Sequence, residues 1–80
     1  METKAFTLSI TVANRYGVLA RVAGLFSKRG FNIETLHVAA MPEDRNFSRI
    51  ILTSNGDEAT KLQIVKQLSK LHDVKETKII

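Results

Sequence analysis

The residues best suited to chemistry in this chain are Asn14, Gly17 and Asn32, which flank one helical stretch. A glycine before a helix lets the backbone approach a ligand closely, and the first N–H groups of a helix have no acceptor within it. These amides, here those of Val18 and Leu19, and the positive end of the helix dipole favour a bound carboxylate. The Asn14 amide can accept from an α-ammonium or donate to that carboxylate. The pattern indicates a site for a small zwitterion, with no nucleophile and base beside it.

The first half of the chain predicts a strand, a turn and a helix that hold these residues. Residues 6–12 alternate between apolar and small polar side chains, as a half-buried strand does. From Val18 the apolar positions recur at helical spacing, and Gly30 then favours the left-handed conformation just past a helix C-terminus. The expected buried stripe of this helix is Val18, Leu19, Val22, Leu25 and Phe26.

Two further strands follow the helix. Residues 32–41 predict a strand in which Ile33 is out of phase with Leu36, so either Ile33 precedes the regular pairing or a bulge resets the register. Residues 42–46 have the composition of a turn. Residues 47–54 predict the next strand, in which apolar side chains again alternate with polar ones.

A second helix and a closing strand complete the chain. Residues 55–57 stop the preceding strand, and Asp57 is a suitable N-cap for the helix. Asp73 ends the helical run, and residues 74–80 predict the last strand. The expected buried stripe of the second helix is Leu62, Val65, Leu68 and Leu71, broadened by Ile64.

The predicted order of elements, βαββαβ, defines the fold class. Two helices on one face of a four-stranded antiparallel sheet form an α+β, ferredoxin-like arrangement. Right-handed crossovers place the first and third strands in the centre of the sheet and the second and fourth strands at its edges. These elements fill residues 1–80, so the sequence predicts a single domain.

The composition argues against several classes of function. The chain has no cysteine, and His37 and His72 have no second ligand at a suitable spacing, so we expect no metal site. Its net charge of +4 comes from scattered Lys and Arg, and the sheet face expected to be open lacks the aromatic residues that stack on RNA bases. No apolar run is long enough to span a membrane, and residues 1–4 lack a signal-peptide core. We expect a cytoplasmic protein that binds neither nucleic acid nor membranes.

Asn32 favours a ligand site that lies between two copies of the chain. An exposed edge strand is a liability that dimerisation removes. Pairing of the second strands through these edges would make an eight-stranded sheet and bring Asn32 of one chain near the Gly17 turn of the other. Such a homodimer would have two ligand sites.

An enzymatic alternative stays open from the residues alone. An acyl-phosphate hydrolase of this fold would use Arg15 to hold the phosphate and the Asn32 amide to place a water molecule. An anion cradle needs several clustered backbone N–H groups, and the single glycine of this turn gives it little support.

The run from Asn14 to Leu36, N-x-x-G-V-L-x-R-V-x-G-L-F-x-x-R-G-F-N-I-E-x-L, resembles the ACT domain of the acetolactate synthase (acetohydroxyacid synthase) small regulatory subunit. The resemblance extends over nearly the whole chain. It continues through Val38-Ala39, Ser48-Arg49, Gly56-Asp57-Glu58 and residues 67–74.

This resemblance implies a non-catalytic regulatory subunit of branched-chain amino-acid synthesis. In that family valine, and in some members leucine or isoleucine, binds at the ACT dimer interface. The small subunit activates the large catalytic subunit and confers feedback inhibition. Thiamine diphosphate, FAD and Mg are expected on the large subunit, and no cofactor on this chain. The effector-binding residues that the resemblance implies are Asn14, Gly17, Val18, Leu19, Asn32 and Ile33.

Two expectations follow from the extent of the resemblance. Many members carry a second, C-terminal domain, and we expect residues 1–80 to form a single ACT domain without it. The alternative to a sensor is a stand-alone interaction module, which would bind the large subunit and have no effector of its own.

Overall fold

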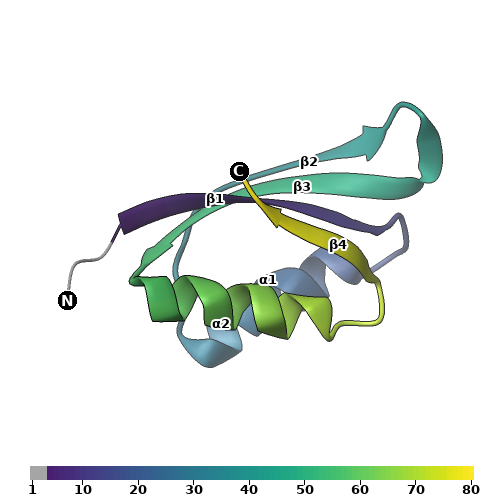
Figure 1. The fold of residues 1–80 in the computed structure, drawn as a ribbon. Coiled ribbons are helices and arrows are strands. Elements are labelled where there is room, and N and C mark those ends of the chain that lie inside the picture. The colour runs from purple at the N-terminus through teal and green to yellow at the C-terminus, as the bar shows by residue number, and fades with distance from the viewer. Residues whose placement is uncertain (1–3) are drawn as a thin grey trace.

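Six elements make up the part of the chain that the computed structural model describes, residues 4–80 (Figure 1). Residues 1–3, part of the segment in which we expect no signal peptide, lie outside the described residues. The order of elements confirms the predicted βαββαβ chain. The elements are β1 Lys4–Ala13, α1 Val18–Arg29, β2 Ile33–Met41, β3 Asp44–Gly56, α2 Glu58–Ser69 and β4 Val74–Ile79.

The four strands form one antiparallel sheet in the order β2-β3-β1-β4. β1 and β3 lie in the centre and β2 and β4 at the edges, which confirms the predicted ferredoxin-like arrangement. Figure 1 shows both helices on one side of this sheet. Within residues 4–80, neither helix is long and apolar enough to cross a membrane.

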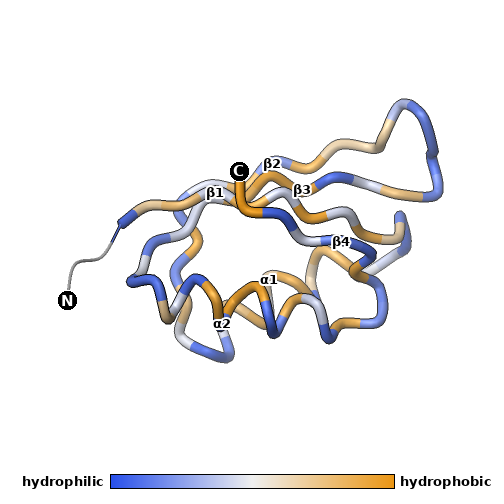
Figure 2. The backbone as a smooth tube through the Cα atoms, viewed as in Figure 1, coloured by the Kyte–Doolittle hydropathy of each residue, from blue (hydrophilic) through white to orange (hydrophobic). Residues whose placement is uncertain are grey.

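The core lies between the sheet and the two helices. In the central strands every second side chain points toward the helices, and Leu8 and Ile10 of β1 pair with Leu52 and Ile50 of β3. The tip of the β2–β3 hairpin is hydrophilic and projects past the helices (Figure 2). The buried apolar residues are Leu8, Ile10, Val12, Val18, Val22, Phe26, Ile50, Leu52, Ile64 and Leu68.

Both ends of α1 are glycines in the left-handed conformation. Gly17 is the N-cap with φ of 85°, and Gly30 is the C-cap with φ of 73°. The N–H of Gly30 donates to the carbonyl of Ser27 at 3.2 Å, and the N–H of Phe31 donates to the carbonyl of Phe26 at 2.8 Å. These bonds satisfy carbonyls at the end of the helix and confirm the predicted role of Gly30.

The β2–β3 hairpin is tighter and longer than predicted. Only Pro42 and Glu43 form its loop, because Met41 pairs with Asp44. β3 therefore begins earlier than predicted, at Asp44, and it continues through the predicted stop as far as Gly56. The polar residues near the tip have the composition of a turn because no core lies opposite them. The predicted turn over 42–46 is therefore wrong beyond its first two residues.

One predicted core position of α2 is wrong. Leu62 is 55% exposed, whereas Ile64 and Leu68 are completely buried. Ile64 and Leu68 lie four residues apart on one face, with Val65 and Leu71 packed partly against the same core. Leu62 lies about 200° around the helix from Ile64, so its side chain points away from the sheet. The buried stripe is therefore centred on Ile64.

The register of β2 resets next to Ile33. Ile33 pairs with Ser54 and Thr35 pairs with Thr53, so Glu34 is an extra residue in β2. This is a β-bulge, the second of the two alternatives that the sequence left open. A bulge bends its strand and changes the direction of the side chains beside it.

Replacing Leu68 by alanine should destabilise the fold by about 2–5 kcal/mol, because this side chain is completely buried between α2 and the sheet. Leu62→Ala in the same helix should change the free energy of unfolding by less than about 0.5 kcal/mol, because its side chain is mostly exposed. Urea denaturation followed by circular dichroism measures both values. Equal losses from the two variants would contradict the assignment of the buried face.

The stability of the fold should depend on pH through the N-cap of α2. The Asp57 carboxylate accepts from the backbone N–H of Thr60 at 2.8 Å, and this bond lowers the pKa of Asp57 below its ordinary value. Because the folded-state pKa is the lower one, the stabilisation is present above the unfolded-state pKa and is lost as pH falls through the folded-state pKa. Asp57→Asn keeps the acceptor without the charge, so its melting temperature should fall less in acid than that of the parent. Thermal melts at descending pH measure this difference. An identical fall of the melting temperature in acid for Asp57→Asn and the parent would refute the prediction.

Candidate functional site

Gly17 shapes the β1–α1 turn. Its φ of 85° lies in the left-handed region, which side chains with a Cβ disfavour. A Cβ at this position would meet no atom within 4 Å, so the space next to the turn is open. Within α1 no side chain caps the first turn and no acidic residue lies in it. The positive end of the helix dipole is therefore available to an external anion.

The backbone donors at this turn are those of Leu19 and Ala20. The N–H of Val18 donates to the carbonyl of Arg15 over a long distance of 3.4 Å, while those of Leu19 and Ala20 have no acceptor among residues 4–80. The Val18 side chain is 2% exposed and belongs to the core. The Leu19 side chain, which the sequence predicts to be buried, is 43% exposed and extends the open surface beside the turn.

Asn14 joins the turn to the start of β3. Its backbone N–H donates to the carbonyl of Asn46 at 2.8 Å, and its side-chain Nδ2 donates to the carbonyl of Arg45 at 3.0 Å. The amide is exposed, and its Oδ1 accepts no hydrogen bond from residues 4–80. Asn14 is therefore fixed at one side and free to accept at the other.

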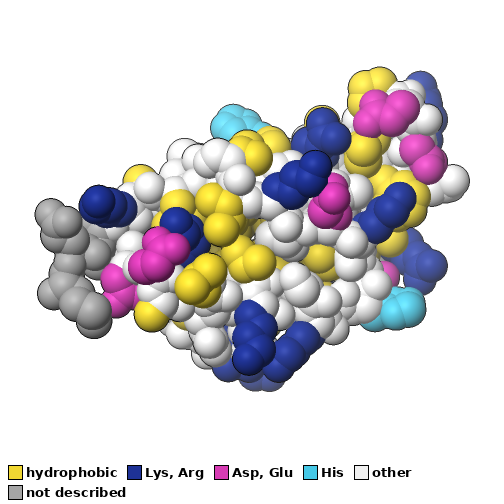
Figure 3. All heavy atoms as spheres, viewed as in Figure 1, with side chains coloured by type: hydrophobic (Ala, Val, Ile, Leu, Met, Phe, Trp, Pro, Cys, Tyr) yellow, Lys and Arg dark blue, Asp and Glu magenta, His cyan; other side chains and the backbone are white. Residues whose placement is uncertain are grey.

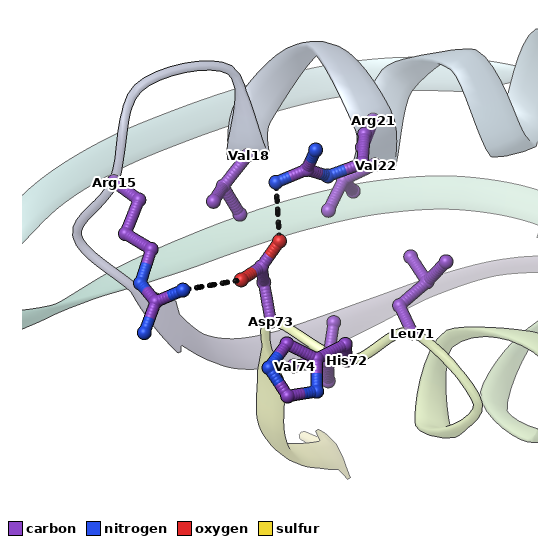
Figure 4. Close-up of a pocket in the computed structure, with 8 residues that line it drawn as sticks. All are labelled: Arg15, Val18, Arg21, Val22, Leu71, His72, Asp73 and Val74. Atoms are coloured by element: carbon purple, nitrogen blue, oxygen red, sulfur yellow. Dashed lines mark hydrogen bonds and ion pairs between the residues drawn. The ribbon is translucent and has the colours of Figure 1, made fainter.

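Asp73 connects the turn with the loop between α2 and β4. Its carboxylate, whose side chain is 10% exposed, lies between the guanidinium groups of Arg15, at 3.8 Å, and Arg21 (Figure 4). Its backbone carbonyl also accepts from the N–H of Ala13 at 2.8 Å. From the sequence, Asp73 is expected only to end a helix, because nothing local links it to arginines more than 50 residues away in the chain.

A pocket of about 310 Å³ lies around this ion-pair cluster (Figure 4). Its apolar wall comes from valine and leucine side chains. Both arginines face the Asp73 carboxylate, which balances one of their two positive charges. The lining residues are Arg15, Val18, Arg21, Val22, Leu71, His72, Asp73 and Val74.

The other two predicted site residues lie at the far end of α1. Gly17 precedes the twelve residues of α1 and Asn32 follows them, so the helix separates the two positions by about 18 Å along its axis. Ile33 begins β2 at that same end and packs partly against the core. One chain does not bring Asn14 and Asn32 together, as Figure 1 also shows by the course of α1. The pairing of Arg15 with Asn32, on which the hydrolase alternative rested, does not occur within one chain for the same reason.

Three neighbours hold Asn32 in place. The completely buried Ser54 donates its hydroxyl to the backbone carbonyl of Asn32. The side-chain Nδ2 of Asn32 donates to Oε1 of Glu34 at 2.9 Å, and Nδ2 of Asn55 donates to the same oxygen. Sequence reasoning missed these neighbours. Asn32 and Glu34 are two residues apart in the chain, and this short separation is the one local signal for their contact. The two β3 partners have no local signal.

The charged side chains are distributed over several parts of the surface. Figure 3 shows Lys and Arg at separate places on the visible face, with Asp and Glu between some of them. Among residues 4–80, no three His, Cys, Asp or Glu side chains gather in a way that would hold a metal ion. The described chain thus offers hydrogen-bond donors and acceptors at the ends of α1 as its candidate binding groups.

Comparison with known proteins gives a consistent assignment. A family described as "AHAS small subunit-like ACT domain" matches residues 8–76. The chain is 49% identical over 74 residues to the acetolactate synthase small subunit of Mycobacterium avium, covering 92% of this chain and 44% of that protein. It is 51% identical over 67 residues to the acetolactate synthase isozyme 3 small subunit of Escherichia coli, covering 84% of this chain and 40% of that protein.

A solved structure agrees with these relatives. The crystal structure of an acetolactate synthase small subunit from Thermotoga maritima superposes with a TM-score of 0.88 at 37% identity, covering 95% of this chain and 47% of that chain. The chain spans less than half of the length of each of these three proteins. The chain belongs to the family of AHAS small subunit-like ACT domains.

Proposed function

We propose that this chain is the effector-binding regulatory domain of an acetolactate synthase small subunit, and that it binds a branched-chain amino acid between two copies of itself. Family membership supports the regulatory part of the proposal. The observation that carries the binding part is the placement of Asn14 and Gly17 at one end of α1 and of Asn32 at the other. Such a split arrangement becomes one site only when a second chain supplies the missing half.

The sheet offers an edge at which the second chain can pair. Among residues 4–80, β2 has β3 as its only neighbour in the sheet. β2 runs from the Asn32 end of the domain toward the end that holds the Gly17 turn. Antiparallel pairing of two β2 strands would therefore place Asn32 of one chain beside the Gly17 turn of its partner. A parallel pairing would place like ends together and leave both half-sites incomplete.

The ligand class follows from the groups that this pairing would bring together. The free N–H groups of Leu19 and Ala20 and the helix dipole suit an α-carboxylate. Side-chain amide oxygens suit an α-ammonium group. The Leu19 side chain is half-exposed beside the Gly17 turn, and this apolar surface suits the aliphatic side chain of a ligand. Valine, leucine and isoleucine have all three features, and we take valine as the first choice.

In this proposal the domain itself carries out no reaction. It activates the large subunit of acetolactate synthase and lowers that activity when the amino acid is bound. Thiamine diphosphate, FAD and Mg stay with the large subunit. We assign this chain no cofactor.

Purified protein titrated with valine by calorimetry should bind about one ligand per chain, as a two-fold symmetric dimer with two sites requires. Leucine and isoleucine should also bind, and lysine should not, because its charged side chain would enter the aliphatic part of the site. Size-exclusion chromatography with light scattering measures the dimer in the same samples. A folded dimer that gives no heat with any of the three amino acids would contradict the sensor and favour an interaction module, provided that it still activates the large subunit.

Asn14→Ala should weaken valine binding by about tenfold or more, because it removes an acceptor for a charged group. Asn46→Ala is the matched control. Asn46 is exposed in the adjacent strand β3, and its side-chain amide makes no hydrogen bond among residues 4–80. Calorimetry compares the two variants with the parent. Equal affinities for the parent and Asn14→Ala would show that the site lies elsewhere.

Gly17→Asp should abolish the response to valine and leave the fold intact. The new carboxylate would enter the open space beside the turn and repel the carboxylate of the ligand. Gly24→Asp is the matched control, because Gly24 is exposed in the middle of α1 and its Cβ would also meet no atom within 4 Å. Valine inhibition of the large subunit is the readout, with circular dichroism to confirm folding. Retained inhibition in Gly17→Asp, or equal loss in both variants, would count against the proposed site.

A further inference from the structure

Glu34 lies in the centre of a hydrogen-bonded network at the start of β2. One carboxylate oxygen, Oε1, accepts from Nδ2 of Asn32 at 2.9 Å and also from Nδ2 of Asn55 at the end of β3. Glu34 is the extra residue of the bulge in β2. A bulge changes the direction of the side chains beside it, and the Glu34 carboxylate contacts both amides. The exposed Asn32 side chain is therefore held at a fixed orientation without any help from the core.

The chemistry of a carboxylate determines which side of the Asn32 amide faces it. An ionised carboxylate accepts hydrogen bonds and donates none, so only the NH₂ group of Asn32 can face Glu34. The Oδ1 of Asn32 must then point away from Glu34. The backbone of Asn32 is fixed independently by the hydroxyl of buried Ser54.

Asn14 has the same orientation for the same reason. Its NH₂ group donates to the carbonyl of Arg45 at 3.0 Å, and a carbonyl oxygen is also only an acceptor. Both asparagines of the proposed site therefore have one N–H of the NH₂ group engaged and the Oδ1 atom available. The hydrogen bonds to Arg45 and Glu34 fix the direction of each amide, so that each Oδ1 is the group left to accept from a ligand.

We propose that Glu34 is a positioning residue, which holds the Asn32 amide with its Oδ1 as the available acceptor, so that the effector site prefers a protonated amine. This inference rests on the proposed function and adds to it the group that the site discriminates. An ammonium group has three donors and no acceptor, so it matches two amide oxygens and gains from the nearby Glu34 charge. A 2-oxo acid has no donor at this position and leaves the amide oxygens unpaired, and an N-acylated amino acid has one uncharged N–H in place of the ammonium group. The site would thus distinguish an amino acid from the 2-oxo acid of the same carbon skeleton.

The first test compares ligands on the parent protein. Valine, 3-methyl-2-oxobutanoate and N-acetylvaline are titrated by calorimetry at equal concentrations. Valine should bind at least about tenfold more tightly than either analogue, because each analogue loses the hydrogen bonds of a charged donor. Equal affinity for valine and the 2-oxo acid would overturn the inference and leave the proposed function standing. Absence of binding by valine itself would overturn the proposed function and, with it, a role for Glu34 in the site.

The second test removes the positioning carboxylate. Glu34→Ala should weaken valine binding by about tenfold and reduce its preference over the 2-oxo acid, because the Asn32 amide can then rotate. Glu34→Gln keeps an acceptor oxygen at the position of the carboxylate. This variant should recover part of the valine affinity and part of the preference over the 2-oxo acid. Glu76→Ala is the matched control, since Glu76 is an exposed strand glutamate on the opposite edge, in β4.

A spectroscopic readout separates positioning from general stability and needs no ligand. The side-chain NH₂ resonances of Asn32 and Asn55 in a ¹⁵N correlation spectrum should both shift in Glu34→Ala and stay in place in Glu76→Ala. Unshifted NH₂ resonances in Glu34→Ala would show that the network does not form and would overturn the inference. Shifted resonances in Glu34→Ala with an unchanged affinity for valine and an unchanged preference over the 2-oxo acid would also overturn the inference. Ligand binding would then not depend on the orientation of the Asn32 amide.

Discussion

The whole domain depends on burying one face of a four-stranded sheet under two short helices. β1 and β3 supply most of the sheet side of this core, and α1 and α2 supply the other side. Since β1 and β3 each have a neighbouring strand on both sides, the free edges of the sheet are β2 and β4. A chain of 80 residues buries only part of its surface in this core, so many side chains outside the core are exposed to solvent and available for binding. The candidate site accordingly lies at the ends of α1, where the core stops.

Local pattern was enough to predict the elements and much of the packing. The alternation of β1, the helical spacing after Val18 and the left-handed Gly30 are all properties of adjacent residues, and each was confirmed. Leu62 shows the limit of this reasoning, because hydrophobicity alone does not tell which of several apolar residues faces the sheet. The polar start of β3 shows the same limit, since hairpin pairing continued where no core required apolar side chains.

The contacts around the candidate site residues could not be predicted from the sequence. The motif identified the family and the two asparagines, but it said nothing of what holds them. Asp73 meets Arg15 and Arg21 only after β4 has docked beside β1, and Asn55 meets Glu34 only after β2 has paired with β3. These contacts join residues far apart in the chain, and a single sequence contains no periodicity that marks them. They are the part of the site that only a folded structure displays.

Under the proposed function, the open space beside Gly17 lets natural selection act separately on sensing and on folding. No atom lies within 4 Å of where its Cβ would be, and Gly17 contributes no side chain to the core. A mutation there would meet backbone strain of about 1–2 kcal/mol and no steric clash. Lineages that gain from constant amino-acid output can therefore discard the proposed control through one residue and keep a domain that folds and pairs. Regulation of the proposed kind could be lost and regained through this one position.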